Sequence, residues 1–420
     1  MRHTLDVDRA NSGESLELET LIDALVAYHR GAASHDAEAQ DAGQPLTLTM
    51  TAELAEIREA LWDEGERERL DQLGDWLKQD LTRLMPILEA RAARRTPSWA
   101  LGHSASRLCH DGRPLLVNAI GRDLEVPGAE LADDPASDLA ALLVGLEGRE
   151  TPELTRLALD RYLRHSGDYE ISRLLSLFGT CHALTAARRA LRRCLDEKLG
   201  LEQPALLAES MAECRRYLEL AERIAEFRFP PLIIAVGVSG SGKSRFTREL
   251  VTGLGAIRVS SEAERQRLVQ ADDSSAHPQG DFAPGVVGIF SEAATMATYR
   301  RLASCAGYLL DAGVPACVDA TCLTRAQRDL LRQQAEARGL PCLLVNFEAD
   351  DATLRRRIEK RAGRQGVAVE ESLAVLAQQQ QRFEPFGDEE RLHLVHLDTT
   401  AGNAGELLAD LVNEHVRLSG

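Results

Sequence analysis

The sequence predicts a mainly α-helical first half followed by an α/β domain with a five-stranded parallel sheet. In the first 225 residues, apolar side chains recur every three or four positions, as along one face of a helix. After residue 230, short β-branched runs alternate with helical segments, which is typical of parallel strands covered by helices on both faces. The pattern changes at Pro230 and Pro231, so we divide the chain into residues 1–225 and 226–420.

The helical interpretation of the first half depends on several apolar stripes. The clearest consists of five leucines on one helix face: Leu70, Leu73, Leu77, Leu81 and Leu84. Similar stripes cover residues 18–29, 152–163 and 183–200. Residues from about 31 to 50 are rich in Gly, Ala and Asp without a period, which predicts a loop. Residues 113–120 (RPLLVNAI) are the one clear strand candidate of this half.

Strands and helices alternate in the second half. The predicted strands cover residues 232–236, 256–260, 316–320, 342–347 and 393–397. A helix is expected over about 291–312 and another after the last strand, and others begin at Lys243, Glu262, Thr324 and Asp351. This order indicates a parallel sheet with helical crossovers.

Composition excludes several classes of protein. The 420 residues carry a formal net charge of −17, which disfavours broad binding to nucleic acid or to an anionic membrane, although a local basic cleft would still permit nucleic acid. The first 14 residues lack the apolar core of a signal peptide, and no run of about 18 apolar residues predicts a membrane span. The eight scattered cysteines are typical of reduced thiols, so we expect a cytoplasmic protein. The oligomeric state is not predicted.

Residues 237–244 (GVSGSGKS) match the pattern G-x-x-x-x-G-K-[ST], with a predicted strand before and a helix after. Glycines let backbone N–H groups turn toward phosphate oxygens, and the helix N-terminus adds partial positive charge. We therefore predict an ATP site in which Lys243 also acts in catalysis and Ser244 binds Mg²⁺. Its residues are Gly237, Val238, Ser239, Gly240, Ser241, Gly242, Lys243, Ser244 and Arg245.

Asp319 is the second candidate ligand for Mg²⁺. It lies at the carboxyl end of a predicted strand, where ligands gather in open α/β sheets. The alternative is a turn or helix-capping aspartate, because Thr321 and Thr324 precede a helix.

Glu262 is the candidate general base for a substrate hydroxyl. It follows the second strand and opens a helix, and Arg265 and Arg267 behind it are candidates for binding an anionic substrate. The alternative is a first-turn glutamate that stabilises the helix dipole, followed by solvated arginines.

Residues 354–366 (LRRRIEKRAGRQG) form a basic segment at the end of a helix. Arg357, Arg361 and Arg364 are candidate catalytic residues of a lid that closes over the phosphates. A solvated basic face is the alternative. For Arg325 and Arg328, after the third strand, we favour an exposed helix face over binding of the acceptor.

The second half resembles a bacterial family of predicted P-loop kinases related to gluconate kinase, zeta toxins and polynucleotide 5′-kinases. The matching pieces are GVSGSGKS, IRVSSEAERQRL, FSEAATMATYRRLA, VDATCLTRAQR and LRRRIEKR. The resemblance covers about residues 230–418 and implies a P-loop kinase fold with a helical lid. Relatives usually have Asp at the position of Glu262, and the acidic-small stretch after the lid arginines is altered here to VAVEES.

In that family the kinase domain often follows a domain similar to aminoglycoside phosphotransferases, and residues 1–225 resemble a degenerate one. The segment SDLAALLVGLEGRETPELTRLALDRYLRHSGDYE resembles the helical C-lobe. The His-Gly-Asp catalytic loop is missing between His110 and Asp111, and Asn118 stands at the metal-binding aspartate position. No glycine-rich N-lobe precedes them, so we expect a non-catalytic domain.

The sequence leaves three functions to be compared. The first is an ATP-dependent kinase that phosphorylates a hydroxyl of an unidentified small molecule, nucleotide or RNA end. The second is a nucleotide-dependent switch or scaffold without transfer. A motor-type ATPase is disfavoured, because no second carboxylate follows Asp319 to polarise water.

Overall fold

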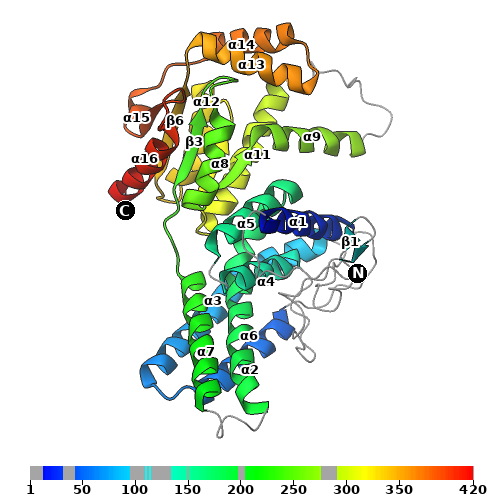
Figure 1. The fold of residues 1–420 in the computed structure, drawn as a ribbon, viewed down its shortest axis with the longest axis vertical. Coiled ribbons are helices and arrows are strands. Elements are labelled where there is room, and N and C mark those ends of the chain that lie inside the picture. The colour runs from blue at the N-terminus through cyan, green and yellow to red at the C-terminus, as the bar shows by residue number, and fades with distance from the viewer. Residues whose placement is uncertain are drawn as a thin grey trace. The chain divides into compact units, whose positions relative to one another are not determined.

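The computed structural model describes residues 13–31, 43–94, 109–110, 113–114, 134–148, 151–196, 204–275 and 291–419 (Figure 1). Contacts divide the chain into two compact units. The first comprises residues 1–166 and 171–227, and the second comprises residues 167–170 and 228–420.

The described part of the first unit is helical apart from two short strands. Its helices are α1 (Gly13–Gly31), α2 (Gly43–Ala60), α3 (Glu64–Arg94), α4 (Pro135–Glu147), α5 (Pro152–Ser166), α6 (Leu175–Asp196) and α7 (Pro204–Ala225). The 3₁₀ helix η4 (Tyr169–Leu174) precedes α6, and its residues from 171 onward belong to this unit. The strands β1 (Cys109–His110) and β2 (Arg113–Pro114) pair antiparallel. Helix α6 packs along α7 and against α2 and α4.

The leucine stripe of α3 is confirmed, since all five leucines are buried. The prediction of a loop over residues 31–50 is wrong for residues 43–50, which belong to α2. Met50, Glu53 and Ile57 are buried at helical spacing, so packing of this face stabilises a helix that its first residues alone do not suggest. Residues 32–42 and 115–120, which include most of the predicted strand, lie outside the described residues.

A five-stranded parallel sheet forms the centre of the second unit, as predicted. Its strands are β3 (Leu232–Val236), β4 (Ile257–Ser260), β5 (Ala316–Asp319), β6 (Cys342–Glu348) and β7 (Leu394–Asp398). They lie in the order β4-β5-β3-β6-β7, with Ala235 opposite both Asp319 and Val345. After β3 the chain continues on the β4–β5 side and later crosses to β6. The carboxyl end of β3 therefore lies at a switch point of the sheet, where open α/β sheets bind ligands.

Helices cover both faces of this sheet. The helices of this unit are α8 (Lys243–Leu254), α9 (Ser261–Ser275), α11 (Glu292–Asp311), α12 (Arg325–Glu336), α13 (Asp351–Gln365), α14 (Val369–Arg382), α15 (Asp388–Arg391) and α16 (Ala404–Ser419), and among them α8, α11, α12 and α16 contact the strands. Alternate strand residues such as Ile233, Cys317 and Val345 pack with Phe246 of α8 and Leu408 of α16 in one apolar core. Helices α11 and α12 contact each other and strands of the sheet, so they cover the opposite face.

Helices α13 and α14 form a hairpin that follows β6 (Figure 1). Leu354 and Ile358 of α13 and Leu376 of α14 are buried together, with Val238 and Leu373 packed against them. This hairpin is the element predicted as a helical lid. No helix within the described ranges is both long and apolar enough to cross a membrane.

Candidate nucleotide site

A glycine-rich loop connects β3 to α8 and forms the centre of the site. Gly242 is the N-cap of α8 at φ +99°, and no described side chain caps this helix end. Gly237 has φ +141°, and a Cβ added there would lie 2.7 Å from the carbonyl oxygen of Phe347. Its N–H donates to the carbonyl of Thr321 at 3.0 Å, which ties the loop to the turn after β5. An uncapped helix N-terminus behind a tight glycine loop fits a phosphate group.

Lys243 is buried at the base of this loop. Its Nζ donates to the carbonyl oxygens of Gly237 at 2.6 Å and Val238 at 2.9 Å, and lies 3.4 Å from Ser241 Oγ. Burial lowers the pKa of Lys243 to about 8, although the negative charge of Asp319 acts in the opposite direction. The ammonium group therefore stands where it can contact an anion in the loop.

Arg245 differs from the other residues of the predicted site. Its N–H donates to the carbonyl of Gly242 at 2.9 Å. Its guanidinium lies 5.1 Å from the centre of the Phe246 ring and 3.6 Å from Glu249. These contacts direct the Arg245 side chain along α8.

Asp319 is buried at the end of β5, beside α8. Its Oδ2 accepts from Thr247 Oγ1 at 3.4 Å and lies 3.6 Å from Arg258 Nη1. The same Nη1 lies 3.4 Å from the carbonyl oxygen of Ser244, whose side chain is exposed. Within the described ranges, no group of three or more His, Cys, Asp and Glu could hold a metal. Ser244 and Asp319 fit Mg²⁺ only as minor ligands beside phosphates and water, which is how this ion usually binds.

The start of α9 contains Glu262 and the two arginines considered as acceptor ligands. Glu262 is exposed in the first turn of the helix. Arg265 is partly buried, and burial lowers its pKa. Arg267 pairs instead with Glu264, which is fully buried and also lies 3.1 Å from Arg301 Nε. Arg267 is therefore engaged in an ion pair rather than freely solvated, and its binding of an anionic substrate stays a prediction.

The three lid arginines lie on α13 in two different environments. Arg357 donates from Nη1 to the carbonyl of Gly240 at 3.2 Å and to Thr399 Oγ1 at 2.9 Å. Arg361 and Arg364 are exposed, and the charge of Arg361 contributes to the lowered pKa of Lys243. The structure thus brings Arg357 into contact with the glycine loop and places Arg361 close enough to affect Lys243.

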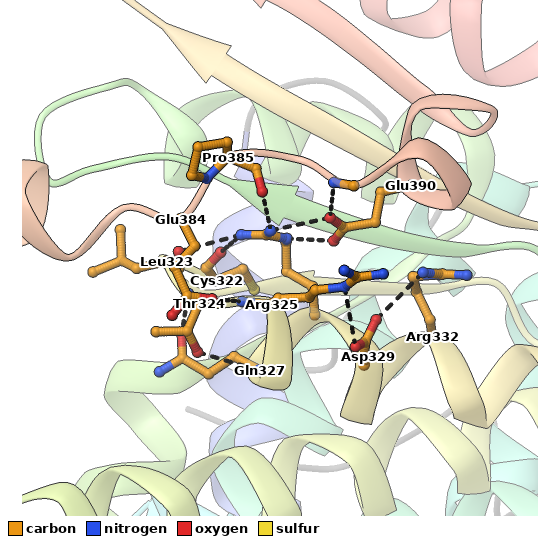
Figure 2. A network of polar contacts seen from close by, with 12 residues as sticks. Cys322, Leu323, Thr324, Arg325, Gln327, Asp329, Arg332, Glu384, Pro385 and Glu390 are labelled. Atoms are coloured by element: carbon orange, nitrogen blue, oxygen red, sulfur yellow. Dashed lines mark hydrogen bonds and ion pairs between the residues drawn. The ribbon is translucent and has the colours of Figure 1, made fainter.

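The prediction that Arg328 lies on an exposed helix face is wrong. Its side chain is completely buried, and its Nε donates to the equally buried Glu390 at 2.5 Å. Nη1 and Nη2 donate to the carbonyl oxygens of Cys322, Leu323 and Pro385. Figure 2 shows how the turn after β5 and the segment around Pro385 and Glu390 meet in this network. Arg328 therefore anchors the chain that follows the hairpin.

Sequence reasoning missed three contributors to the site. Thr247 follows Lys243 by one helical turn, a spacing that indicates a shared face. Arg258 lies within a short strand, and its charge is the only feature of the sequence that indicates a role in the site. Gln379 accepts a hydrogen bond from the N–H of Ser239 at 2.7 Å, and no local pattern distinguishes it within a run of four glutamines.

Comparison with known proteins agrees with this geometry. Residues 232–386 match the family model described as an AAA domain. The match covers β3 to the end of the hairpin, including the whole glycine loop. The second unit thus has a P-loop nucleotide-binding fold. The likeness of residues 1–225 to aminoglycoside phosphotransferases stays a prediction, and Asp111 and Asn118 lie outside the described residues.

Two curated mycobacterial relatives match part of the chain. The chain is 26% identical over 272 residues to the uncharacterized proteins Rv2004c of Mycobacterium tuberculosis and Mb2027c of Mycobacterium bovis, covering 64% of this chain. It spans about half the length of these curated relatives (51%).

Two solved kinase structures each cover slightly less than half of the chain. A gluconokinase from Sinorhizobium meliloti is 23% identical and covers 46% of this chain and 95% of its own, with a TM-score of 0.32. A sugar kinase from Janibacter is 20% identical and covers 45% and 95%, with a TM-score of 0.30.

Proposed function

We propose that the second unit is an ATP-dependent phosphotransferase. It moves the γ-phosphate of ATP to a hydroxyl of a small molecule, a nucleotide or an RNA end. The observation that carries the proposal is the uncapped N-terminus of α8 behind the glycine loop, with buried Lys243 at its base and buried Asp319 one strand away. Phosphoryl transfer depends mainly on positioning and charge stabilisation, so these few groups are sufficient for the donor side.

Each group has a defined role in this proposal. The loop N–H groups and Lys243 bind the phosphates, and Ser244 and Asp319 hold Mg²⁺, which neutralises phosphate charge when bound. Glu262 accepts the proton of the acceptor hydroxyl. The hydroxyl oxygen bonds to the γ-phosphorus of ATP at the same time, and ADP leaves. Arg357 positions the loop through Gly240, while Arg361 and Arg364 supply positive charge from α13.

The test compares two glutamates that both lie exposed in a first helical turn, Glu262 of α9 and Glu292 of α11. Glu262→Gln should lower phosphate transfer at least 100-fold while ATP affinity stays within about twofold. Glu292→Gln should change neither, because it shares only the helix-dipole role. Transfer is measured with γ-labelled ATP against fractionated pools of metabolites and RNA.

Two results would count against the proposal. Normal phosphate transfer by Glu262→Gln would show that Glu262 is not the general base. Binding of ATP by the unmodified chain without transfer to any fraction rejects phosphotransfer itself.

A nucleotide-dependent switch is the second candidate. It is favoured by the bond between Gln379 of α14 and the loop N–H of Ser239, because a ligand in the loop would compete with it. Binding of ATP without transfer, together with a partner retained only when nucleotide is present, would favour this function.

A further inference from the structure

One hydrogen bond connects the helical hairpin directly to a group that would bind phosphate. Ser239 is the third residue of the glycine motif, and its N–H donates to Gln379 Oε1 at 2.7 Å. Backbone N–H groups of such loops are the donors that hold phosphate oxygens. The amide oxygen of Gln379 therefore accepts the bond that a phosphate oxygen would accept.

Apolar packing holds Gln379 in this position. It follows buried Leu376 by three residues, so both side chains lie on the same face of α14. Leu376 packs with Leu354 and Ile358 of α13, and Val238, the residue before Ser239, packs against this cluster. The hairpin thus contacts the loop through one apolar cluster, the Gln379 bond and the bond from Arg357 to Gly240.

The chain after the hairpin is anchored to the turn after β5. Glu384 accepts from the N–H of Arg325 at 2.6 Å, and its own N–H donates to the carbonyl of Leu323 at 2.8 Å. The buried pair of Arg328 and Glu390 follows a few residues later. Gln379 can therefore leave Ser239 while the end of the hairpin stays fixed to the turn after β5 (Figure 2).

We propose that Gln379 is a phosphate surrogate, which holds α14 on the loop and is displaced when a nucleotide phosphate binds. The proposal rests on the proposed nucleotide site and adds its regulation. Because the phosphate and Gln379 compete for one donor, nucleotide binding removes this bond between α14 and the loop, and loss of the bond favours nucleotide binding to the same extent.

The run of four glutamines offers a matched control. Gln379→Ala removes the surrogate, whereas Gln378→Ala changes a neighbouring exposed side chain of the same helix. Removal of one neutral competing hydrogen bond should tighten binding about 3- to 10-fold. We expect this gain for Gln379→Ala and no change for Gln378→Ala, with inorganic tripolyphosphate and fluorescent ATP as ligands in the full chain.

A second variant tests the same bond in the opposite direction. Gln379→Glu keeps the acceptor oxygen and adds a negative charge, which strengthens the bond to Ser239 and repels phosphate. It should weaken tripolyphosphate binding at least tenfold, and added salt should reduce the effect. Unchanged thermal unfolding of each variant would show that the fold is retained.

Hydrogen exchange gives a readout besides affinity. Tripolyphosphate should increase amide exchange in α14 of the unmodified chain, and Gln379→Ala should show the faster exchange without ligand. Unchanged or weaker binding by Gln379→Ala, or α14 exchange that does not respond to ligand, overturns the proposal.

The outcomes separate this proposal from the proposed function. Absence of tripolyphosphate and ATP binding in every variant overturns both. Phosphate transfer with no gain for Gln379→Ala overturns the surrogate alone. Tighter binding by Gln379→Ala without transfer by any variant supports the surrogate and rejects phosphotransfer.

Discussion

Gly240 shows how a single residue defines the phosphate loop. It has φ +84°, and a Cβ added there would lie 3.1 Å from the carbonyl oxygen of Leu354 and 3.2 Å from Ile358 Cγ1. Both neighbours belong to α13. The loop and the hairpin approach closely only because this position has no side chain.

Gly240→Ala should therefore destabilise the second unit by about 1–2 kcal/mol, the cost of a left-handed conformation in an L-residue. It should also weaken ATP binding at least tenfold. Gly253→Ala in α8 is the control, because no atom lies within 4 Å of its added Cβ. It should be neutral or stabilising by up to about 1 kcal/mol. Urea unfolding and ATP titration measure both effects, and equal behaviour of the two variants would contradict the steric argument.

The lowered pKa of Lys243 predicts that both the stability of the second unit and its affinity for ATP depend on pH. Its pKa is about 8 in the folded chain, below the usual value of about 10.4. Between these values the unfolded lysine holds a proton that the folded lysine has lost, so the stability of the nucleotide-free unit rises with pH in this window. Phosphate favours the charged lysine, so ATP affinity should fall above pH 8, by up to tenfold per pH unit.

Isothermal titration between pH 7 and 9.5 measures this fall, together with proton uptake on binding above pH 8. Lys243→Met should bind weakly with no such slope. A constant affinity of the unmodified chain across this range would show that Lys243 does not contact the phosphates.

At the scale of elements, the buried ion pair of Arg328 and Glu390 joins α12 to α15. Both side chains have an exposed fraction of 0%. Removing one partner leaves a buried charge, so Arg328→Met or Glu390→Gln should each cost about 3–5 kcal/mol. Arg325→Gln breaks an exposed pair with Asp329 on the same helix and should cost less than about 1 kcal/mol. Chemical unfolding that ranks the three variants equally would contradict this assignment.

Local patterns predicted most element boundaries in the second unit. The strand at 232–236 and the helix starting at Lys243 lie where expected, because the glycine motif fixes both ends of the loop. In the first unit, α2 begins earlier than its composition suggests, since its stability comes from burial of Met50 and Ile57. Arg328 was misjudged for a similar reason, because its partner Glu390 lies 62 residues away.

At the scale of the whole molecule, the division into two units predicts which residues change their amide exchange when nucleotide binds. With a non-hydrolysable ATP analogue and Mg²⁺, amide exchange should change in residues 237–247 and in α13 and α14. Helices α3, α6 and α7 should exchange as before, because the proposed kinase chemistry needs only the second unit. Hydrogen exchange mass spectrometry of the full chain tests this. A response in α6 or α7 would instead favour the switch.

The sequence by itself determined the parallel sheet, the helical first half and the glycine loop with Lys243 and Ser244. These features depend on short-range periodicity and on a contiguous motif. Only the tertiary structure decided that Arg258 lies beside Asp319, that Glu264 engages Arg267, and that Gln379 bonds to Ser239. Such contacts depend on which helix faces and strand ends meet, and Gln379 and Ser239 are 140 residues apart in the chain.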